Sequence, residues 1–164
     1  MTEPLRTERL TLRLLRADDA PALHACFSNP EVMSYFDVPH ERMEQTQAWV
    51  DGTVAAPEDR TREYVLVESG TVIGKAGIWR RPELGFLLRR DRWRQGLMHE
   101  ALTALLPHVS ELMGLDAVTA DVDTRNGPCI ALLTGLGFVE THRAERTVRI
   151  GDTWTDSVYF EWRA

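Results

Sequence analysis

A run of arginines followed by a single glycine, at residues 89–96, is the part of the sequence whose residue types most clearly predict chemistry. It follows an apolar run at 84–88, which predicts a buried strand, and precedes residues 97–113, which predict an amphipathic helix. The N–H groups at a helix start are unpaired and the helix dipole is positive there, so they bind phosphate without any special side chain. Gly96 lets the backbone approach such an anion, and arginines add charge-assisted hydrogen bonds. The pattern predicts a phosphate-binding loop, with an ordinary surface loop as the alternative.

A second strand, loop and helix occupy residues 117–137. Asn126 follows an apolar strand pattern, Gly127 or Pro128 starts the helix, and Gly137 stops it before a further strand. Together the two patterns resemble the GNAT superfamily of acyl-CoA-dependent N-acyltransferases. That family has a Q/R-x-x-G-x-G/A phosphate loop after a strand, and N-x-x-S/A followed by L-G-F in its second half. The matching positions here are 93–98, 126–129 and 136–138.

The resemblance extends over nearly the whole chain. Residues 7–13, Thr-Glu-Arg-Leu-Thr-Leu-Arg, resemble the T-E-R-L-x-L-R opening of one branch, the ribosomal-protein N-terminal acetyltransferases and their relatives. Residues 29–33, the Glu-Ala pair at 100–101 and the last hairpin at 151–159 resemble the same branch. The implied fold is the α/β GNAT fold, a mixed, mostly antiparallel sheet flanked by helices. Its central parallel strands splay apart to admit the pantetheine arm of coenzyme A.

Length and composition favour one globular domain, residues 1–164, without repeats or linkers. Hydrophobic residues make up 43% and charged residues 27%, an ordinary balance for a folded domain. No apolar run approaches the ~18 residues that span a membrane, and the N-terminus lacks the pattern of a signal segment. We therefore expect a cytoplasmic protein without a membrane partner.

Charge, cysteines and histidines argue against several other kinds of site. The net charge is −6 and the pI is about 5.4, whereas non-specific nucleic-acid binding needs a basic face, so we expect no nucleic-acid partner. Cys26 and Cys129 form no CxxC pair, and the five histidines form no HxxxH or HExxH pair. We expect neither a disulfide framework nor a bound metal.

Hydrophobic periodicity predicts the order strand, two helices, three strands, helix, strand, helix, two strands. Pro107 lies inside the long helix and is expected to bend it, because proline removes one backbone hydrogen bond. The expected elements are strand 10–15, helices 17–27 and 41–54, strands 62–68, 72–79 and 82–88, helix 97–113, strand 117–122, a helix from 127, and strands 139–149 and 153–162.

The resemblance implies a site for acetyl-CoA that is built mostly from backbone groups. Amides from Arg94 to Met98 are expected to cradle the pyrophosphate, and the backbone of Phe86 and Leu88 to pair with the pantetheine amides. Asn126 matches the asparagine that hydrogen-bonds pantetheine, with a helix N-cap as an alternative or additional role. The full set expected to bind the coenzyme is Phe86, Leu88, Trp93, Arg94, Gln95, Gly96, Leu97, Met98, Asn126 and Cys129.

Two positions in the phosphate loop differ from the usual family pattern. Trp93 stands where Gln or Arg is usual, although the ribosomal-protein branch often has Trp there. Met98 stands where Gly or Ala is usual, and its larger side chain narrows the approach to the pyrophosphate while its N–H remains available. Arg89, Arg90 and Arg92 are candidates to bind the ribose 3′-phosphate, with simple exposure to solvent as the alternative.

The implied reaction needs a base for the amine and a proton for the leaving thiolate. Asp121 is the first candidate base, because several relatives place a carboxylate there, and Glu83 is the alternative; a structural salt bridge is open for both. Cys129 stands where the family has Ser or Ala and is a candidate acid, or else a small buried hydrophobic residue. Leu133 replaces the Tyr acid of many relatives, so water or an unassisted departure are the other routes.

On this resemblance we expect an N-acetyltransferase that moves an acetyl group from acetyl-CoA to a primary amine by direct attack. The branch favours a protein N-terminal α-amine; antibiotics, polyamines and metabolites are the other acceptors. Leu133, Met98 and Cys129 also permit a second hypothesis, an acyl-CoA-binding sensor without catalysis. A third is a nucleotide-phosphate binding module of unrelated chemistry. Homodimers are frequent in the family, so the resemblance allows a homodimer.

Overall fold

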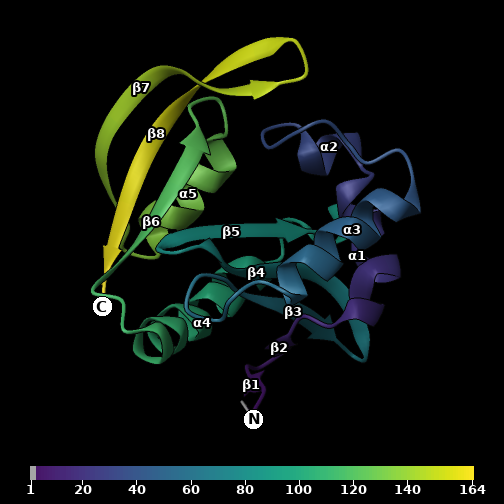
Figure 1. Cartoon of the computed structure of the whole chain (residues 1–164). Coiled ribbons are helices and arrows are strands. Elements are labelled where there is room, and N and C mark those ends of the chain that lie inside the picture. Colours follow the sequence, from purple (N-terminus) through teal and green to yellow (C-terminus); the bar gives the residue numbers. More distant parts are fainter. Residues whose placement is uncertain (1–2) are drawn as a thin grey trace.

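The computed structural model, which describes residues 3–164, contains one sheet of eight strands in the order β1-β2-β3-β4-β5-β6-β8-β7 (Figure 1). Neighbouring strands are antiparallel except for β5 and β6, which are parallel. The mixed, mostly antiparallel sheet predicted from the sequence is therefore confirmed. The strands are β1 (Leu5–Arg6), β2 (Thr11–Leu14), β3 (Arg62–Glu68), β4 (Thr71–Arg80), β5 (Glu83–Leu88), β6 (Ala117–Asp123), β7 (Val139–Ile150) and β8 (Thr153–Arg163).

Helices cover both faces of the sheet, and each face has its own hydrophobic cluster. Side chains of successive strand residues point to opposite faces, so in β3 Leu66 packs with the α4 side and Val65 with the α1 and α3 side. Both side chains are fully buried, and burial of this kind contributes about 1.5–3 kcal/mol for each side chain. The helices are η1 (Ala17–Asp19), α1 (Ala20–Phe27), α2 (Pro30–Met33), α3 (Met43–Val54), η2 (Arg90–Arg92), α4 (Leu97–Met113) and α5 (Gly127–Gly135).

The parallel strands β5 and β6 separate soon after they meet. Among residues 3–164 their only paired positions are Glu83 and Thr119, and the Thr119 N–H donates to the Pro82 carbonyl at 3.1 Å. Beyond this point β5 stays paired with β4, while β6 pairs along its length with β8, and the two strands diverge (Figure 1). The splay implied by the family resemblance is therefore present, and it opens the sheet beside residues 84–88.

The predicted order of the longer elements is confirmed, whereas three short elements, β1, α2 and η2, were missed. β1 has two residues and α2 has four, too few for a periodic pattern to be read. Residues 28–30 were expected only to end a helix, but they also begin α2. The Asn29 side chain accepts hydrogen bonds from the N–H groups of Glu31 and Val32, at 2.9 and 3.3 Å, and Pro30 occupies the first turn. α4 continues through Pro107 to Met113.

The described part of the chain has neither a membrane-spanning helix nor a cluster of metal-binding side chains. Within residues 3–164, no helix is both long enough and apolar enough to span a membrane. In the same residues, no three His, Cys, Asp or Glu side chains are grouped so as to hold a metal ion.

Candidate functional site

The segment from residue 89 to 96, called the phosphate loop below, ends at an uncapped helix start. Gly96 is the N-cap residue of α4 and has φ +74°, in the left-handed region, and it has no side chain to cap the helix. The first main-chain bond of the helix runs from the Glu100 N–H to the Gly96 carbonyl, at 3.0 Å. The side chains of Leu97 and Met98 are buried, so at the helix end these residues offer their N–H groups. This arrangement can accept an anion.

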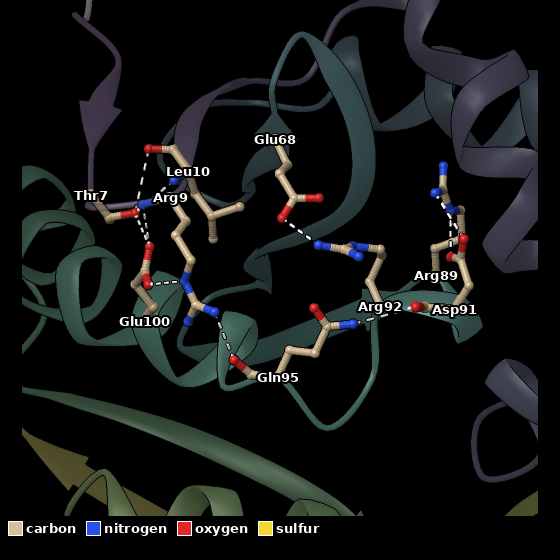
Figure 2. A network of polar contacts seen from close by, with 9 residues as sticks. All are labelled: Thr7, Arg9, Leu10, Glu68, Arg89, Asp91, Arg92, Gln95 and Glu100. Carbon is tan, nitrogen blue, oxygen red and sulfur yellow. Dashed lines mark hydrogen bonds and ion pairs between the residues drawn. The ribbon is translucent and has the colours of Figure 1, made fainter.

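Ion pairs already engage most arginines of the phosphate loop. Arg89 pairs with Asp91 at 2.6 Å, which lowers the pKa of that carboxyl group. Arg90 pairs with Glu31 of α2 at 2.8 Å. Arg92 pairs with Glu68 at the end of β3 at 2.5 Å (Figure 2). These arginines are partly exposed to solvent, and each also has an ion-pair partner. Their pairs fasten the loop to neighbouring elements, and a role toward the 3′-phosphate stays a prediction.

Trp93 turns back toward the sheet rather than toward the helix start. Its indole N–H donates to the Leu88 carbonyl at 2.8 Å, and the guanidinium carbon of Arg90 lies 4.6 Å from the centre of its ring. The side chain also packs against the hydrophobic cluster on the α1 and α3 side. Trp93 therefore braces the end of β5 against the phosphate loop, which gives a physical reason for a tryptophan at this position.

Hydrogen bonds fix which backbone groups of β5 face the gap to β6. The Arg89 N–H donates to a carbonyl of β4 at 2.8 Å, whereas the Pro82 carbonyl accepts from β6 at 3.1 Å. Backbone groups of alternate residues along a strand point to opposite edges. Those of Phe86 and Leu88 therefore face the gap, on the same side as those of Pro82. An extended ligand lying in the gap would meet both backbone groups of Phe86 and the Leu88 N–H, as expected for the pantetheine arm. The Leu88 carbonyl already accepts a hydrogen bond from the Trp93 indole.

Asn126 and Cys129 lie together at the start of α5, on the other side of the gap. The Asn126 side-chain oxygen accepts a hydrogen bond from the Cys129 N–H at 3.3 Å, so the predicted N-cap role is present. Burial raises the pKa of the Cys129 thiol to about 12, which keeps it protonated near neutral pH. Leu133, one turn further along, is completely buried in the core. The Cys129 thiol is partly buried and packs against the core cluster, and Leu133 carries no hydroxyl.

Glu83 and Asp121, the two candidate bases, share one face of the sheet. Glu83 is paired in register with Thr119, and Asp121 follows two residues along the same strand, so all these side chains point the same way. Glu83 accepts a hydrogen bond from the Trp79 indole at 2.7 Å and lies 3.6 Å from Arg80. Its pKa is raised, mainly by burial, and the negative charge of Asp121 adds to the rise.

The salt bridge that the sequence left open therefore exists for one candidate base and not for the other. Glu83 has its ion pair with Arg80. Asp121 is half-exposed and, within residues 3–164, its carboxylate has no hydrogen bond or ion pair. Its neighbours in β6, Ala120 and Val122, point into the core instead. Asp121 thus stays available to a ligand or to water, whereas Glu83 is held in place.

Two surface segments meet above this face and are called the acceptor rim below: residues 34–38 and the turn between β7 and β8. The Arg125 guanidinium lies 5.5 Å from the Tyr35 ring and is held by Asp123 at 2.7 Å. A Cβ atom on Gly151 would lie 3.6 Å from Val38, so the hairpin turn nearly touches the first segment. Trp154 is 45% exposed next to that turn. Arg125 was missed in the sequence, because only the fold brings it to an aromatic residue from another element.

A buried ion pair on the same face was also missed. Lys75 of β4 donates to Glu63 of β3 at 3.1 Å, and both side chains are almost completely buried. The Lys75 ammonium lies 5.1 Å from the centre of the Trp49 ring. One signal was available, since a lysine inside an apolar strand must be paired to be buried. Its partner cannot be named from sequence, because the strand register decides it.

Comparison with known proteins gives one family and several similar folds. The family model described as "Acetyltransferase (GNAT) domain" matches residues 9–139. The uncharacterized N-acetyltransferase p20 of Bacillus licheniformis is 32% identical over an aligned length of 146, and the match covers 83% of this chain and 82% of p20. The structure of RimL, a ribosomal-protein alpha-N-acetyltransferase solved with coenzyme A, matches with a TM-score of 0.90 at 18% identity over 98% of both chains. The microcin self-immunity acetyltransferase MccE, solved with acetyl-CoA and AMP, has a TM-score of 0.84 at 10% identity over 96% of this chain and 93% of its own.

Proposed function

Since this chain belongs to the GNAT acetyltransferase family, we propose that it transfers an acetyl group from acetyl-CoA to a protein N-terminal α-amine. The observation that carries the proposal is the open edge of β5, which runs toward the uncapped start of α4. An extended pantetheine arm fits the open edge of β5, and the diphosphate attached to it fits the start of α4. We assign the coenzyme to the residue set expected from the sequence, with Phe86 and Leu88 contributing backbone groups and Gly96, Leu97 and Met98 the cradle.

In the proposed reaction the neutral amine attacks the thioester carbonyl directly. The new carbon–nitrogen bond forms, the carbon–sulfur bond breaks, and the oxyanion of the intermediate accepts a hydrogen bond from a backbone N–H of β5 that faces the gap. The amine proton passes to a carboxylate, directly or through one water. Coenzyme A leaves as the thiolate and takes up a proton from solvent.

We assign the base to Glu83, with Asp121 as the charge that tunes it. A base is most effective when its pKa lies near the working pH, and burial together with the charge of Asp121 raises the pKa of Glu83 in that direction. The indole of Trp79 fixes the carboxylate at 2.7 Å. This assignment reverses the order of preference reached from the sequence, where Asp121 came first.

Cys129 is proposed to stabilise the leaving thiolate by hydrogen bonding and not by full proton transfer. Its pKa of about 12 makes it a weaker acid than an ordinary thiol, whose pKa is about 8.5. Transfer of its proton to the coenzyme thiolate would therefore be unfavourable in free energy. A hydrogen bond from the S–H group avoids this cost, because Cys129 keeps its proton. Water then supplies the proton, consistent with the buried Leu133 at the position where many relatives have Tyr.

The peptide α-amine is proposed as the acceptor because of the fold similarity to RimL, whose acceptor is a protein N-terminus. Similarity to MccE supports a second candidate, a small-molecule amine. A cytosolic location is part of the proposal, supported by the two free cysteines, Cys26 and Cys129.

The proposal is tested by release of free coenzyme A thiol from acetyl-CoA in the presence of an amine panel. The panel holds short peptides with different N-terminal residues, a polyamine and an aminoglycoside. We expect coenzyme A thiol to be released only when a peptide is the acceptor. Mass spectrometry of the product should then place the acetyl group on the peptide α-amine. Release only with a polyamine or aminoglycoside would favour the second candidate. No thiol release with any acceptor, in a sample that binds acetyl-CoA, would favour a coenzyme sensor without catalysis.

A further inference from the structure

The turn between β1 and β2 lies against the first turn of α4, although some ninety residues separate them in the sequence (Figure 2). The Thr7 N–H donates to the Leu10 carbonyl at 2.9 Å, and the Leu10 N–H donates to the Thr7 hydroxyl oxygen at 3.0 Å, which closes the turn. The Thr7 hydroxyl then donates to one carboxylate oxygen of Glu100 at 2.5 Å. The N-terminal turn is therefore fastened to α4 through Glu100.

Arg9 makes the second and larger part of this connection. Its backbone N–H donates to Glu100 Oε2 and its Nε to Glu100 Oε1, both at 2.8 Å. Its Nη1 donates to the carbonyl of Gln95 at 2.8 Å. Its Nη2 lies 3.6 Å from the point that a Cβ atom on Gly96 would occupy. One guanidinium thus spans the first turn of the helix and the end of the phosphate loop.

These contacts remove two obstacles to anion binding at the start of α4. Glu100 is negatively charged in the first turn, where it would repel a diphosphate, and the donors of Thr7 and Arg9 lower its pKa and offset its charge. The Gln95 carbonyl immediately precedes Gly96, and its negative end would also repel an anion if it turned inward. Because Arg9 holds that carbonyl, the loop keeps the direction in which its N–H groups are presented.

We propose that Arg9, oriented by Thr7 and Glu100, is a positioning residue that holds the Gln95–Gly96 segment in its anion-binding shape. The inference rests on the proposed function, because it assumes that acetyl-CoA is the anion bound there. The loop contains two residues with positive φ, Arg94 at +61° and Gly96 at +74°, so its shape needs support from outside. A loop fixed before binding loses less conformational freedom when the ligand arrives, which strengthens binding.

The test compares two acetyl donors in the Arg9→Ala variant. Acetyl-CoA carries the diphosphate, whereas S-acetylpantetheine carries the same thioester and amides without any phosphate. For acetyl-CoA, Kd and KM should rise about tenfold, since charge-assisted hydrogen bonds to the loop are lost. The kcat at saturating acetyl-CoA and the KM for S-acetylpantetheine should stay within about twofold, because neither depends on the phosphate loop.

Three further variants separate positioning from general stability. Arg6→Ala is the matched control, since Arg6 is an exposed arginine in the same segment whose side chain has no polar partner within residues 3–164. The Arg6→Ala variant should leave the Kd and KM for both acetyl donors unchanged. Arg9→Lys keeps the charge but cannot hold Glu100 and the Gln95 carbonyl at once, so it should rescue only part of the loss. Thr7→Val should raise the Kd for acetyl-CoA by a smaller factor in the same direction.

Each outcome decides a different claim. An unchanged acetyl-CoA Kd in Arg9→Ala would overturn the positioning role, and so would an equal loss with both donors, which would indicate general destabilisation. If Arg9→Ala melts below the assay temperature, the same criteria apply to Arg9→Lys and Thr7→Val. A wild-type protein that binds neither donor would instead contradict the proposed function itself.

Discussion

The phosphate loop and the acceptor rim are held in place in very different ways. The phosphate loop is fastened by charged contacts to separate parts of the fold, through Arg90 to α2, Arg92 to β3 and the Gln95 carbonyl to Arg9. The acceptor rim is closed by the approach of Gly151 to Val38, which is 52% exposed, and by one contact between a cation and a ring. One region is held by ion pairs and hydrogen bonds, whereas the two segments of the other meet through an apolar approach and a contact between a cation and a ring.

This difference fits what each region is proposed to bind. The diphosphate of acetyl-CoA is the same in every reaction, so a rigid loop costs nothing in versatility and lowers the entropy lost on binding. Acceptor peptides differ in the side chains at their N-termini, so the surface that binds them has to accommodate different shapes. Individual exposed ion pairs contribute only ~0–1 kcal/mol. Several of them around one short loop act mainly by limiting its conformations.

The largest effect is expected from Glu83→Gln, which should lower kcat at least ~100-fold, because the proposed base is lost. The Kd for acetyl-CoA should not change, since the phosphate loop lies elsewhere. Stopped-flow thiol release and calorimetric titration measure the two quantities. Glu140→Gln, on the exposed strand β7, is the control and should behave as wild type. Unreduced turnover in Glu83→Gln would remove this residue as the base.

The next effect concerns the phosphate loop alone. Gly96→Ala should raise the Kd for acetyl-CoA about tenfold, because φ +74° costs a residue with a Cβ atom roughly 1–2 kcal/mol and the methyl group would lie 3.6 Å from Arg9. Gly52→Ala is the matched control: it lies in α3, and its Cβ atom would meet nothing within 4 Å. Equal affinities of the two variants for acetyl-CoA would contradict the assignment of Gly96, Leu97 and Met98 to diphosphate binding.

Asp121→Asn should shift the pH profile more than it changes the maximum rate. The folded-state pKa of Glu83 is raised by burial and, further, by the charge of Asp121, so the base is lost as pH falls through that raised value. Without the negative charge the pKa of Glu83 falls, and the acidic limb of kcat/KM should move to lower pH. Measuring both proteins with one acceptor cancels the titration of the amine. A limb that stays in place, or moves to higher pH, would contradict the coupling.

The smallest effect is expected at the acceptor rim. Trp154→Ala should change the KM for the acceptor a few-fold, because the indole is 45% exposed and contributes contact area rather than charge. The Kd for acetyl-CoA and the kcat should remain unchanged. Steady-state kinetics with two peptides of different N-terminal residues would show whether the change depends on the side chain. A matching loss of coenzyme affinity would mean that the two regions are not independent.

The sequence alone could predict features that depend on local patterns, but not contacts that form only in the folded chain. The order of the longer elements and the glycine at the helix start follow from local patterns, namely period-two strands, amphipathic helices and one basic loop. The parallel, splayed strands were implied by the family resemblance. Arg9 was visible only as part of a family motif. Its contact with Gln95 depends on a turn that closes across the fold, which no local pattern reports.

The surroundings of the two candidate bases could not be predicted from the sequence, for a physical reason. Asp121 was preferred as base because several relatives place a carboxylate there; its position is half-exposed, and its carboxylate has no ion pair within residues 3–164. The environment of Glu83 is decided by Trp79 and Arg80, which reach it across the turn between β4 and β5. Burial and neighbouring charges set a pKa, and both come from tertiary structure.

The most direct test of the account is an initial-rate study of thiol release in which acetyl-CoA and the acceptor peptide are both varied. Direct attack inside a complex of both substrates predicts intersecting double-reciprocal lines and no thiol release when the peptide is absent. Parallel lines, together with an acetyl group on Cys129 found by mass spectrometry after incubation with acetyl-CoA alone, would contradict direct transfer and indicate a covalent enzyme intermediate instead.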